Sequence, residues 1–247
     1  MSSISDNKKY PNFCKQAALD NDVFATFKSN ATYNEILEHV TYEEGGDYIS
    51  QFASNTTVIN KLADYQINDK LGGPKCYNYL QYGIFSPTTL RYIKILSDLS
   101  QLDLNNKSII EIGAGYGGQY TILKQLFKPK KYTFIDLEDV LLLIKKYVIT
   151  LKQDDIDLEY VACGNITTDI LSDLVISNYA FSECNADIQD IYIKHILKHA
   201  KHGYMIYNNF NGYSHNDLAK ILNESNKHVR INKEIPQTHP NNVILTW

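Results

Sequence analysis

The segment IIEIGAGYGGQY, residues 109–120, brings an acid and a glycine cluster together where a ligand could bind. Gly113, Gly115 and Gly118 satisfy the pattern G-x-G-x-x-G between a predicted strand and a predicted helix. Absent side chains let the backbone approach a ligand, and the start of the helix offers free N–H groups. Asp136 closes the next predicted strand, where a carboxylate can accept hydrogen bonds from ribose hydroxyls. The pattern predicts a nucleoside cofactor, with a glycine turn that holds no ligand as the alternative.

The glycine pattern fits either NAD or S-adenosylmethionine, and three further features favour S-adenosylmethionine. Glu111 lies in the strand that feeds the loop, where a buried acid would suit an ammonium group and would repel a pyrophosphate. The loop follows a long region of helix-like spacing, whereas many NAD-binding domains begin their chain. The chain also ends in a predicted strand pair. An NAD-dependent oxidoreductase is the first rival, and a cofactor-binding scaffold without activity is the second.

From Lys107 onward, predicted strands and helices alternate, which favours an α/β fold with a mostly parallel sheet. The segments HVRINKEIP and NNVILTW are typical of a closing antiparallel strand pair. Residues 1–100 have helical spacing, and Ser86 followed by Pro87 is typical of a helix start. We therefore predict a helical cap over residues 1–100 and a cofactor-binding domain over residues 101–247. Ligands should bind at the carboxyl ends of the parallel strands.

The segment EIGAGYGGQY resembles motif I of class I S-adenosylmethionine-dependent methyltransferases. DLVISNYAFSEC at residues 173–184, GYMIYNN and the terminal NNVILTW together resemble a family of sugar O-methyltransferases more narrowly. The resemblance covers the chain from residue 72 onward and includes the pair Ser182-Glu183. It implies a Rossmann-like methyltransferase fold, S-adenosylmethionine as cofactor, and methyl transfer to a hydroxyl of a free sugar, a nucleotide-sugar or a glycan. An O-methyltransferase for another class of small molecule is the alternative.

A sugar hydroxyl is a poor nucleophile, so a base near it would accelerate methyl transfer. Glu183 is the first candidate, because it follows the fourth predicted strand at the ligand edge, although it could equally be a solvated glutamate at a helix start. His239 is the second candidate, in the polar turn QTHPNN, with an exposed turn histidine as its alternative. Tyr179 could contribute to catalysis, line the pocket or hydrogen-bond the sugar.

The predicted contacts of S-adenosylmethionine lie on the glycine loop and at the ends of the following strands. They are Glu111, Gly113, Ala114, Gly115, Tyr116, Gln119, Asp136, Leu137, Cys163, Gly164 and Asn178. The predicted contacts of the substrate are Arg91, Tyr179, Ser182, Asn208 and Asn209. Arg91 could pair with a phosphate of the acceptor, or form a surface ion pair instead. The asparagine amides suit sugar hydroxyls, or a turn at the end of the strand.

His195 and His199 have the i,i+4 spacing of helical metal ligands. Neighbouring Lys194, Lys198 and Lys201 favour a solvated basic face instead, so we predict no metal site.

The chain has 247 residues, of which 44% are hydrophobic, and a net charge of −4. This charge argues against a nucleic-acid partner, because proteins that bind nucleic acids usually carry an excess of basic residues. The sequence shows neither a signal-like start nor an apolar run of about 18 residues. We therefore expect a cytoplasmic enzyme that acts on a sugar or nucleotide-sugar, with no nucleic-acid or membrane partner. A homo-oligomer is compatible with these features.

Overall fold

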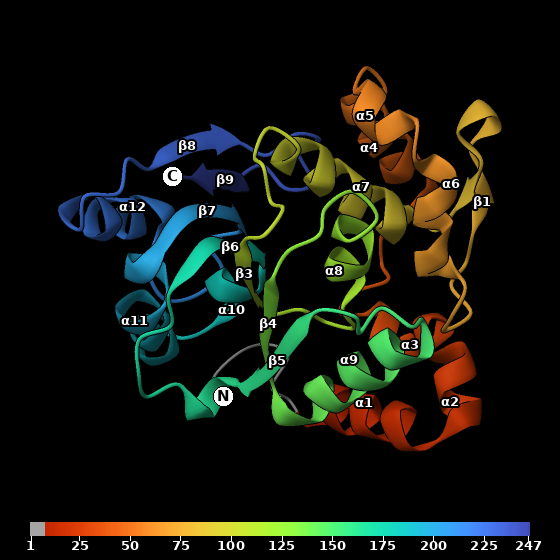
Figure 1. Cartoon of the computed structure of the whole chain (residues 1–247), viewed down its shortest axis with the longest axis horizontal. Helices are drawn as coiled ribbons and strands as arrows, with labels where there is room; N and C mark the ends of the chain where they lie inside the picture. Colours follow the sequence, from red (N-terminus) through yellow and green to blue (C-terminus); the bar gives the residue numbers. More distant parts are fainter. Residues whose placement is uncertain (1–7) are drawn as a thin grey trace.

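A seven-stranded sheet forms the centre of the computed structural model, which describes residues 8–247 (Figure 1). The first part of the predicted cap, residues 1–7, lies outside the described part of the chain. The strands of this sheet are β3 Ser108–Ile112, β4 Lys131–Asp136, β5 Asp157–Ala162, β6 Ser172–Asn178, β7 Ala200–Tyr207, β8 Arg230–Lys233 and β9 Val243–Thr246. Two short strands, β1 Tyr77–Asn78 and β2 Ile84–Phe85, pair with each other outside this sheet.

The order of the strands across the sheet is β5-β4-β3-β6-β7-β9-β8. Strands β3 to β7 pair in parallel, whereas β9 runs antiparallel to both β7 and β8. The chain leaves β3 on one side through β4 and β5 and then crosses to β6 on the other side. The carboxyl ends of β3, β4 and β6 therefore meet at the switch point where such sheets bind ligands. This arrangement confirms the predicted Rossmann-like methyltransferase sheet with its antiparallel C-terminal strand pair.

The central strands β3, β4 and β6 are buried on both faces, as their apolar sequences require, whereas the edge strand β8 is exposed. Because side chains alternate along a strand, Ile109 of β3 joins one hydrophobic core and Ile110 and Ile112 join another. Glu111, between these two isoleucines, points to the same side as Ile109. The central strand therefore brings one carboxyl into an otherwise apolar layer.

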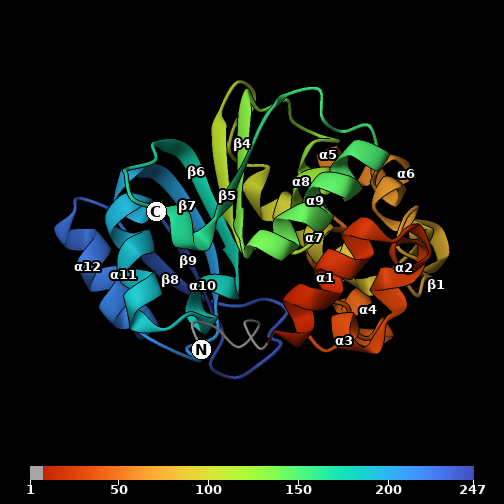
Figure 2. The same cartoon turned by 90° about the horizontal axis from the view of Figure 1, so that it is seen from below.

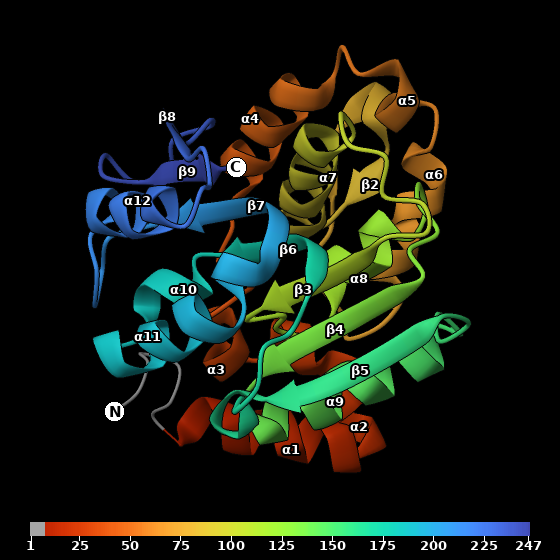
Figure 3. The ribbon, with the colours of Figure 1, turned by 60° about the vertical axis from the view of Figure 1, so that its left-hand side comes forward.

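Helices cover the two faces of the sheet in different ways (Figure 2). The helices are α1 Lys9–Leu19, α2 Asn21–Thr26, α3 Ala31–Asn34, α4 Tyr42–Phe52, α5 Thr56–Ile59, α6 Leu62–Tyr65, α7 Pro87–Leu99, α8 Gly118–Leu123, α9 Glu138–Thr150, α10 Ala180–Glu183, α11 Ala186–His195 and α12 His215–Glu224. Helices α10, α11 and α12 lie on one face, and α7, α8 and α9 lie on the other. On the second side α1 packs against α9 and α4 packs against α7 (Figure 3). The N-terminal helices thus form an outer layer, and the predicted boundary between two domains stays a prediction.

Helix α7 begins as its sequence predicts. Ser86 caps it, because its Oγ accepts a hydrogen bond from the Thr89 N–H at 3.2 Å, and Pro87 occupies the first turn. The apolar residues Leu90, Ile93 and Leu96 of α7 join the core, and α4 packs against the same helix, so most of α7 is buried. Arg91 of α7 consequently has only 7% of its surface exposed.

None of the helices in residues 8–247 combines the length and the apolar character that crossing a membrane requires.

Candidate functional site

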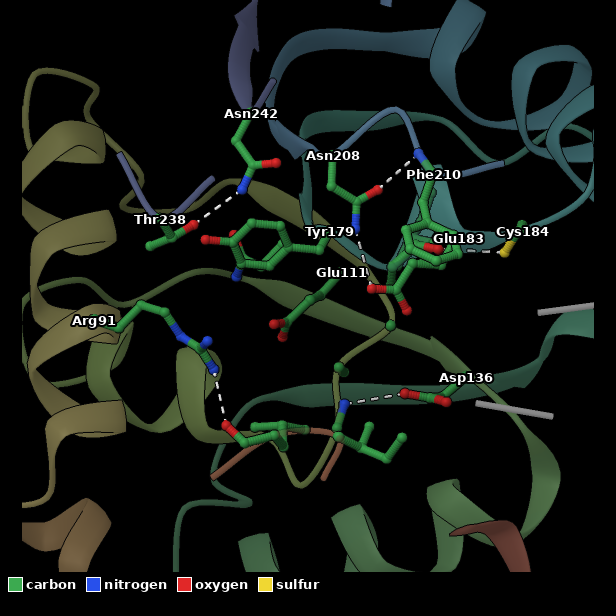
Figure 4. Close-up of a pocket in the computed structure, with 18 of the residues that line it drawn as sticks. Arg91, Glu111, Asp136, Tyr179, Glu183, Cys184, Asn208, Phe210, Thr238 and Asn242 are labelled. Atoms are coloured by element: carbon green, nitrogen blue, oxygen red, sulfur yellow. Dashed lines mark hydrogen bonds between the residues drawn. The ribbon is translucent and has the colours of Figure 1, made fainter. Parts of the chain in front are cut away.

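A cavity of about 660 Å³ lies at the carboxyl ends of the parallel strands (Figure 4). Its walls come from the glycine loop after β3, the ends of β4, β6 and β7, and α10. The N-terminal layer adds residues 36–48 and the start of α7, and the connection between β8 and β9 adds residues 238–242. Segments far apart in the sequence therefore close one site, whose size suits a small-molecule ligand.

The glycine loop depends on two of its glycines for backbone shape and packing. Gly113 has a φ of +74° and Gly115 a φ of +61°, backbone angles that residues other than glycine rarely adopt. A Cβ on Gly113 would lie 2.0 Å from the Cβ of Ala180, and a Cβ on Gly115 would lie 2.4 Å from Cδ1 of Leu37. Leu37, from the N-terminal layer, therefore covers part of the space that Gly115 leaves open.

Asp136, at the end of β4, is held by the backbone of the loop. Its Oδ2 accepts a hydrogen bond from the Gly115 N–H at 3.0 Å, and its Oδ1 accepts one from the Leu137 N–H at 2.8 Å. Burial raises the pKa of Asp136 to about 6, and these backbone bonds oppose that rise. Because each carboxylate oxygen has a second lone pair, Asp136 can still accept two hydroxyl donors from a ligand.

Glu111 is the second carboxyl in this wall and is 2% exposed. Burial raises its pKa to about 8, the charge of Asp136 adds to the rise, and a hydrogen bond from the Tyr132 hydroxyl to Oε2 at 2.7 Å opposes it. Beside these acids, the side-chain oxygen of Asn178 is buried and has no hydrogen-bond partner in residues 8–247. This wall is therefore rich in acceptors and favours a ligand that is cationic or donates hydrogen bonds.

Arg91 lies across the cavity from Glu183, with Glu111 between them (Figure 4). Its Nη2 donates to the backbone carbonyl of Leu37 at 3.3 Å, whereas its buried Nε has no hydrogen-bond partner within the described chain. Aromatic rings flank the guanidinium, at 5.7 Å to the ring centre of Tyr92 and 6.0 Å to that of Tyr179. A buried guanidinium with donors to spare is suited to an anionic group of a ligand.

Glu183 and Asn208 form a polar pair at the ends of α10 and β7. Asn208 Nδ2 donates to Glu183 Oε1 at 3.3 Å, and Ser182 Oγ donates to Asn208 Oδ1 at 2.7 Å. Burial raises the pKa of Glu183, and the bond from Asn208 lowers it in part. Ser182 is fully buried and does not line the cavity. Its position orients Asn208, and through Asn208 the carboxylate.

Tyr179 makes a contact that the sequence analysis did not anticipate. Its hydroxyl donates to Glu234, a 3% exposed carboxyl in the connection between β8 and β9. The other oxygen of Glu234 accepts from Thr238 Oγ1 at 2.7 Å and from Asn242 Nδ2 at 3.0 Å. Burial raises the pKa of Tyr179, so its phenol stays protonated and serves as a hydrogen-bonding group. No local pattern in KEIPQTHPNN marks Glu234 or Asn242 as inward-facing, and their burial follows from how the connection folds.

His239 belongs to the same connection and lines the cavity with an exposed ring. Its Nδ1 accepts a hydrogen bond from the Asn241 N–H at 3.3 Å. Asn209, which also lines the cavity, ties two loops together: its Nδ2 donates to the Asn241 carbonyl at 3.1 Å, and its Oδ1 accepts from the His215 N–H at 2.9 Å. Its amide therefore holds the loops together at the end of β7, as the turn that the sequence offered as the alternative to sugar binding would require.

Most of the predicted site residues meet at this cavity. Those that line it are Arg91, Glu111, Gly113, Ala114, Gly115, Asp136, Leu137, Cys163, Asn178, Tyr179, Glu183, Asn208, Asn209 and His239. Cavity residues that the sequence analysis missed include His39, Tyr48, Tyr92, Thr238 and Asn242. They come from the N-terminal layer and the C-terminal connection, where no motif marks them.

Three predicted cofactor contacts lie elsewhere. Tyr116 is buried in the core, where its hydroxyl accepts a hydrogen bond from Asn68 Nδ2 at 2.9 Å. Gln119 is also buried and donates from Nε2 to the Tyr92 carbonyl at 3.3 Å. Gly164 is exposed beyond the cavity wall. Tyr116 and Gln119 face the core because α7 and the N-terminal layer pack over this part of the loop and α8.

The two histidines with metal-like spacing both contact the carboxyl of Asp169. His195 Nδ1 lies 2.7 Å from one oxygen of Asp169, and His199 Nε2 lies 3.4 Å from the other. Within residues 8–247, no group of three histidine, cysteine or acidic side chains is placed to hold a metal ion.

No protein-family model and no curated protein matches this chain. Solved structures resemble it at low identity. A SAM-dependent methyltransferase from Aquifex aeolicus is 16% identical with a TM-score of 0.47, over 63% of this chain and 86% of that one. A S-adenosylmethionine-dependent methyltransferase from Clostridium acetobutylicum is 12% identical with a TM-score of 0.47, over 63% of this chain and 88% of that one. At this level the likeness says nothing of activity. The strand order of this chain itself defines the class I methyltransferase fold.

Proposed function

We propose that this chain is an S-adenosylmethionine-dependent O-methyltransferase that methylates a hydroxyl of a sugar. The observation that carries the proposal is the charge pattern of the cavity beside the glycine loop. The buried carboxyl of Glu111, the half-buried carboxyl of Asp136 and the unpaired oxygen of Asn178 line this cavity together with the buried guanidinium of Arg91. A cationic cofactor whose amino-acid end carries both an ammonium and a carboxylate complements this pattern.

The residues present fit each part of that cofactor. Asp136 has lone pairs to spare for the ribose hydroxyls, while Glu111 and Asn178 offer acceptors to the ammonium. Arg91 is anchored on Leu37, which covers the glycine loop, so we assign its free donors to the carboxylate of the cofactor. The sequence-based alternative, a phosphate of the acceptor, is an outcome of the test below. A pyrophosphate offers only acceptor oxygens to the unpaired Oδ1 of Asn178 and brings further negative charge toward the Asp136 carboxylate, which disfavours NAD.

S-adenosylmethionine, when bound, supplies a methyl group activated by the adjacent sulfonium. The chain then has to orient the acceptor hydroxyl in line with that methyl and remove its proton. Glu183 is the candidate base, because it lines the cavity and burial raises its pKa. Its carboxylate would take the proton as the oxygen gains the methyl group, contributing roughly 10²–10⁴-fold. Asn208, held by Ser182, would fix the orientation of that carboxylate.

A sugar as acceptor is supported by the other half of the cavity. The second amide hydrogen of Asn208 and the amide of Asn241 can pair with hydroxyl groups, and Tyr48 and Tyr179 add flat aromatic faces. The sequence resemblance to sugar O-methyltransferases points the same way. An O-methyltransferase for another class of acceptor is the alternative.

Calorimetry with S-adenosylhomocysteine and with NAD tests the cofactor. Binding of S-adenosylhomocysteine without NAD supports the proposal, whereas binding of NAD alone overturns it. Mass spectrometry should then be used to screen free sugars, nucleotide-sugars and oligosaccharides for a gain of one methyl group from S-adenosylmethionine. If only acceptors that are not sugars are methylated, the proposed cofactor stands and the proposal of a sugar acceptor is wrong.

A further inference from the structure

A second, more open cavity of about 950 Å³ lies in the N-terminal layer. It shares His39 and Val40 with the first cavity, so the two lie on either side of this short segment. Its wall includes polar groups from the connection before α4 and a loop that leads to β1. None of the sequence motifs assigns a role to this region.

Two acceptors in this wall lack a hydrogen-bond donor within residues 8–247. They are Oε1 of Glu38 and Oδ1 of Asn34, both atoms buried. The neighbouring ammonium of Lys28 does not bond to either of them. Its Nζ donates to the Asn68 carbonyl at 2.5 Å and to the Tyr147 hydroxyl at 3.1 Å. Since buried acceptors without donors are costly, these two atoms are suited to donors from a ligand.

A fixed aromatic surface stands at the rim of the same cavity. Tyr42 is 44% exposed and stacks on Tyr79, with ring centres 4.9 Å apart and planes 19° apart. The Tyr79 hydroxyl donates to the Tyr42 carbonyl at 3.1 Å, and the Tyr77 ring lies 5.3 Å from that of Tyr42. The exposed ring is therefore held in place before any ligand arrives, which lowers the entropy cost of binding.

We propose that this second cavity is a subsite for further sugar units of the acceptor, so that the substrate is an oligosaccharide chain. A sugar ring matches the wall, because its hydroxyls donate to Glu38 and Asn34 while its apolar face lies on Tyr42. A nucleoside diphosphate fits less well, because Glu38 and Glu43 offset the charges of Lys28 and Lys75, which also line the cavity, so the wall carries no excess of positive charge. The inference rests on the proposed function and extends it: the reacting sugar occupies the first cavity and the chain continues past His39 and Val40.

The test is a glycan array that carries mono- to hexasaccharides, probed with the whole protein saturated with S-adenosylhomocysteine. We expect binding to oligosaccharides to exceed binding to their monosaccharides by about tenfold, as one or two added hydrogen bonds would produce. Binding confined to monosaccharides or nucleotide-sugars overturns the proposal, and so does the absence of any bound glycan. If the protein does not bind S-adenosylhomocysteine, the proposed function itself is wrong, and not only the proposed subsite.

Variants of residues in the second cavity test whether this cavity causes the preference for oligosaccharides over monosaccharides. Tyr42→Ala should remove this preference, and Glu38→Gln, which keeps one acceptor oxygen, should reduce it, while the melting temperature and the affinity for S-adenosylhomocysteine stay unchanged. Leu171→Ala is the control, because Leu171 is 75% exposed and lines neither cavity. If both variants keep the wild-type preference for long chains, the subsite lies elsewhere and the proposal is wrong.

Discussion

The Oδ2 atom of Asp136 accepts a hydrogen bond from the backbone N–H of Gly115 at 3.0 Å. The end of one strand is thereby tied to the loop that follows its neighbour. The same carboxylate that could bind a ribose also holds the shape of the glycine loop. Mutations at these two positions consequently report both on ligand binding and on the loop.

Asp136→Ala should weaken the binding of S-adenosylhomocysteine about tenfold or more, because hydrogen bonds to a charged group contribute roughly 1.5–3 kcal/mol. Asp136→Asn keeps one acceptor oxygen and should lose less. Calorimetry on both variants measures the difference. An unchanged dissociation constant in Asp136→Ala would remove Asp136 from the cofactor site.

Gly115→Val is a less informative probe than the motif suggests. Its φ of +61° and the contact with Leu37 make any side chain there strained, whether or not a ligand binds. The loss of binding that we expect would therefore not identify the ligand.

Glu111 predicts a release of protons when the cofactor binds. Its raised pKa, about 8, means that the ligand-free protein holds this proton at pH 7, and an ammonium beside it should lower the pKa. Binding of S-adenosylhomocysteine at pH 7 should therefore release protons, and Glu111→Gln should release fewer. Calorimetry in buffers of different ionisation enthalpy measures this number. Equal release by both proteins would place the ammonium away from Glu111.

The raised pKa of Glu111 also predicts whether the free energy of unfolding rises or falls with pH. Folded Glu111 keeps its proton up to about pH 8, whereas the unfolded chain loses it near about pH 4.3. The unfolded state thus binds fewer protons in this window, so this group lowers the free energy of unfolding as pH rises through it. Denaturant unfolding of ligand-free wild type and Glu111→Gln should show a flatter profile for the variant. A variant that is steeper than wild type would contradict the assignment.

Arg91→Gln should weaken the binding of S-adenosylhomocysteine about tenfold or more, because a buried charge pair with the cofactor carboxylate is lost. Methylthioadenosine lacks the amino-acid end, so its affinity should be the same for wild type and variant. If the affinities for both ligands stay unchanged and the KM of the acceptor rises instead, Arg91 binds the acceptor as the sequence first indicated.

Glu183→Gln should keep the shape and hydrogen-bonding reach of the side chain but lose its capacity to accept a proton. Single-turnover methyl transfer at saturating cofactor should then fall by roughly 10²-fold or more, with cofactor affinity nearly intact. His239→Gln should cost less, because its ring is exposed. An active Glu183→Gln beside an inactive His239→Gln would transfer the role of base to His239. Two active variants would leave positioning as the main source of rate.

Much of the fold could be predicted because its signals are local. The alternation of strands and helices after Lys107, the Ser86 cap with Pro87, and the glycine loop are all patterns within a few residues. Parallel strands bring their carboxyl ends to the same edge of the sheet, and this does not depend on how the helices pack. Asp136, Asn178 and Asn208 could therefore be assigned to one site from the sequence alone.

The tertiary structure decided which distant groups complete that site. Leu37 accepts from Arg91 across 54 residues of chain, and Tyr179 donates to Glu234 across 55. No local periodicity specifies such pairs, because they depend on how the N-terminal layer and the β8–β9 connection pack against the sheet. The same packing turned Tyr116 and Gln119 toward the core, although the glycine motif placed them beside the ligand. The sequence by itself determined the strand ends and their chemistry, whereas burial between distant segments determined the direction in which each side chain points.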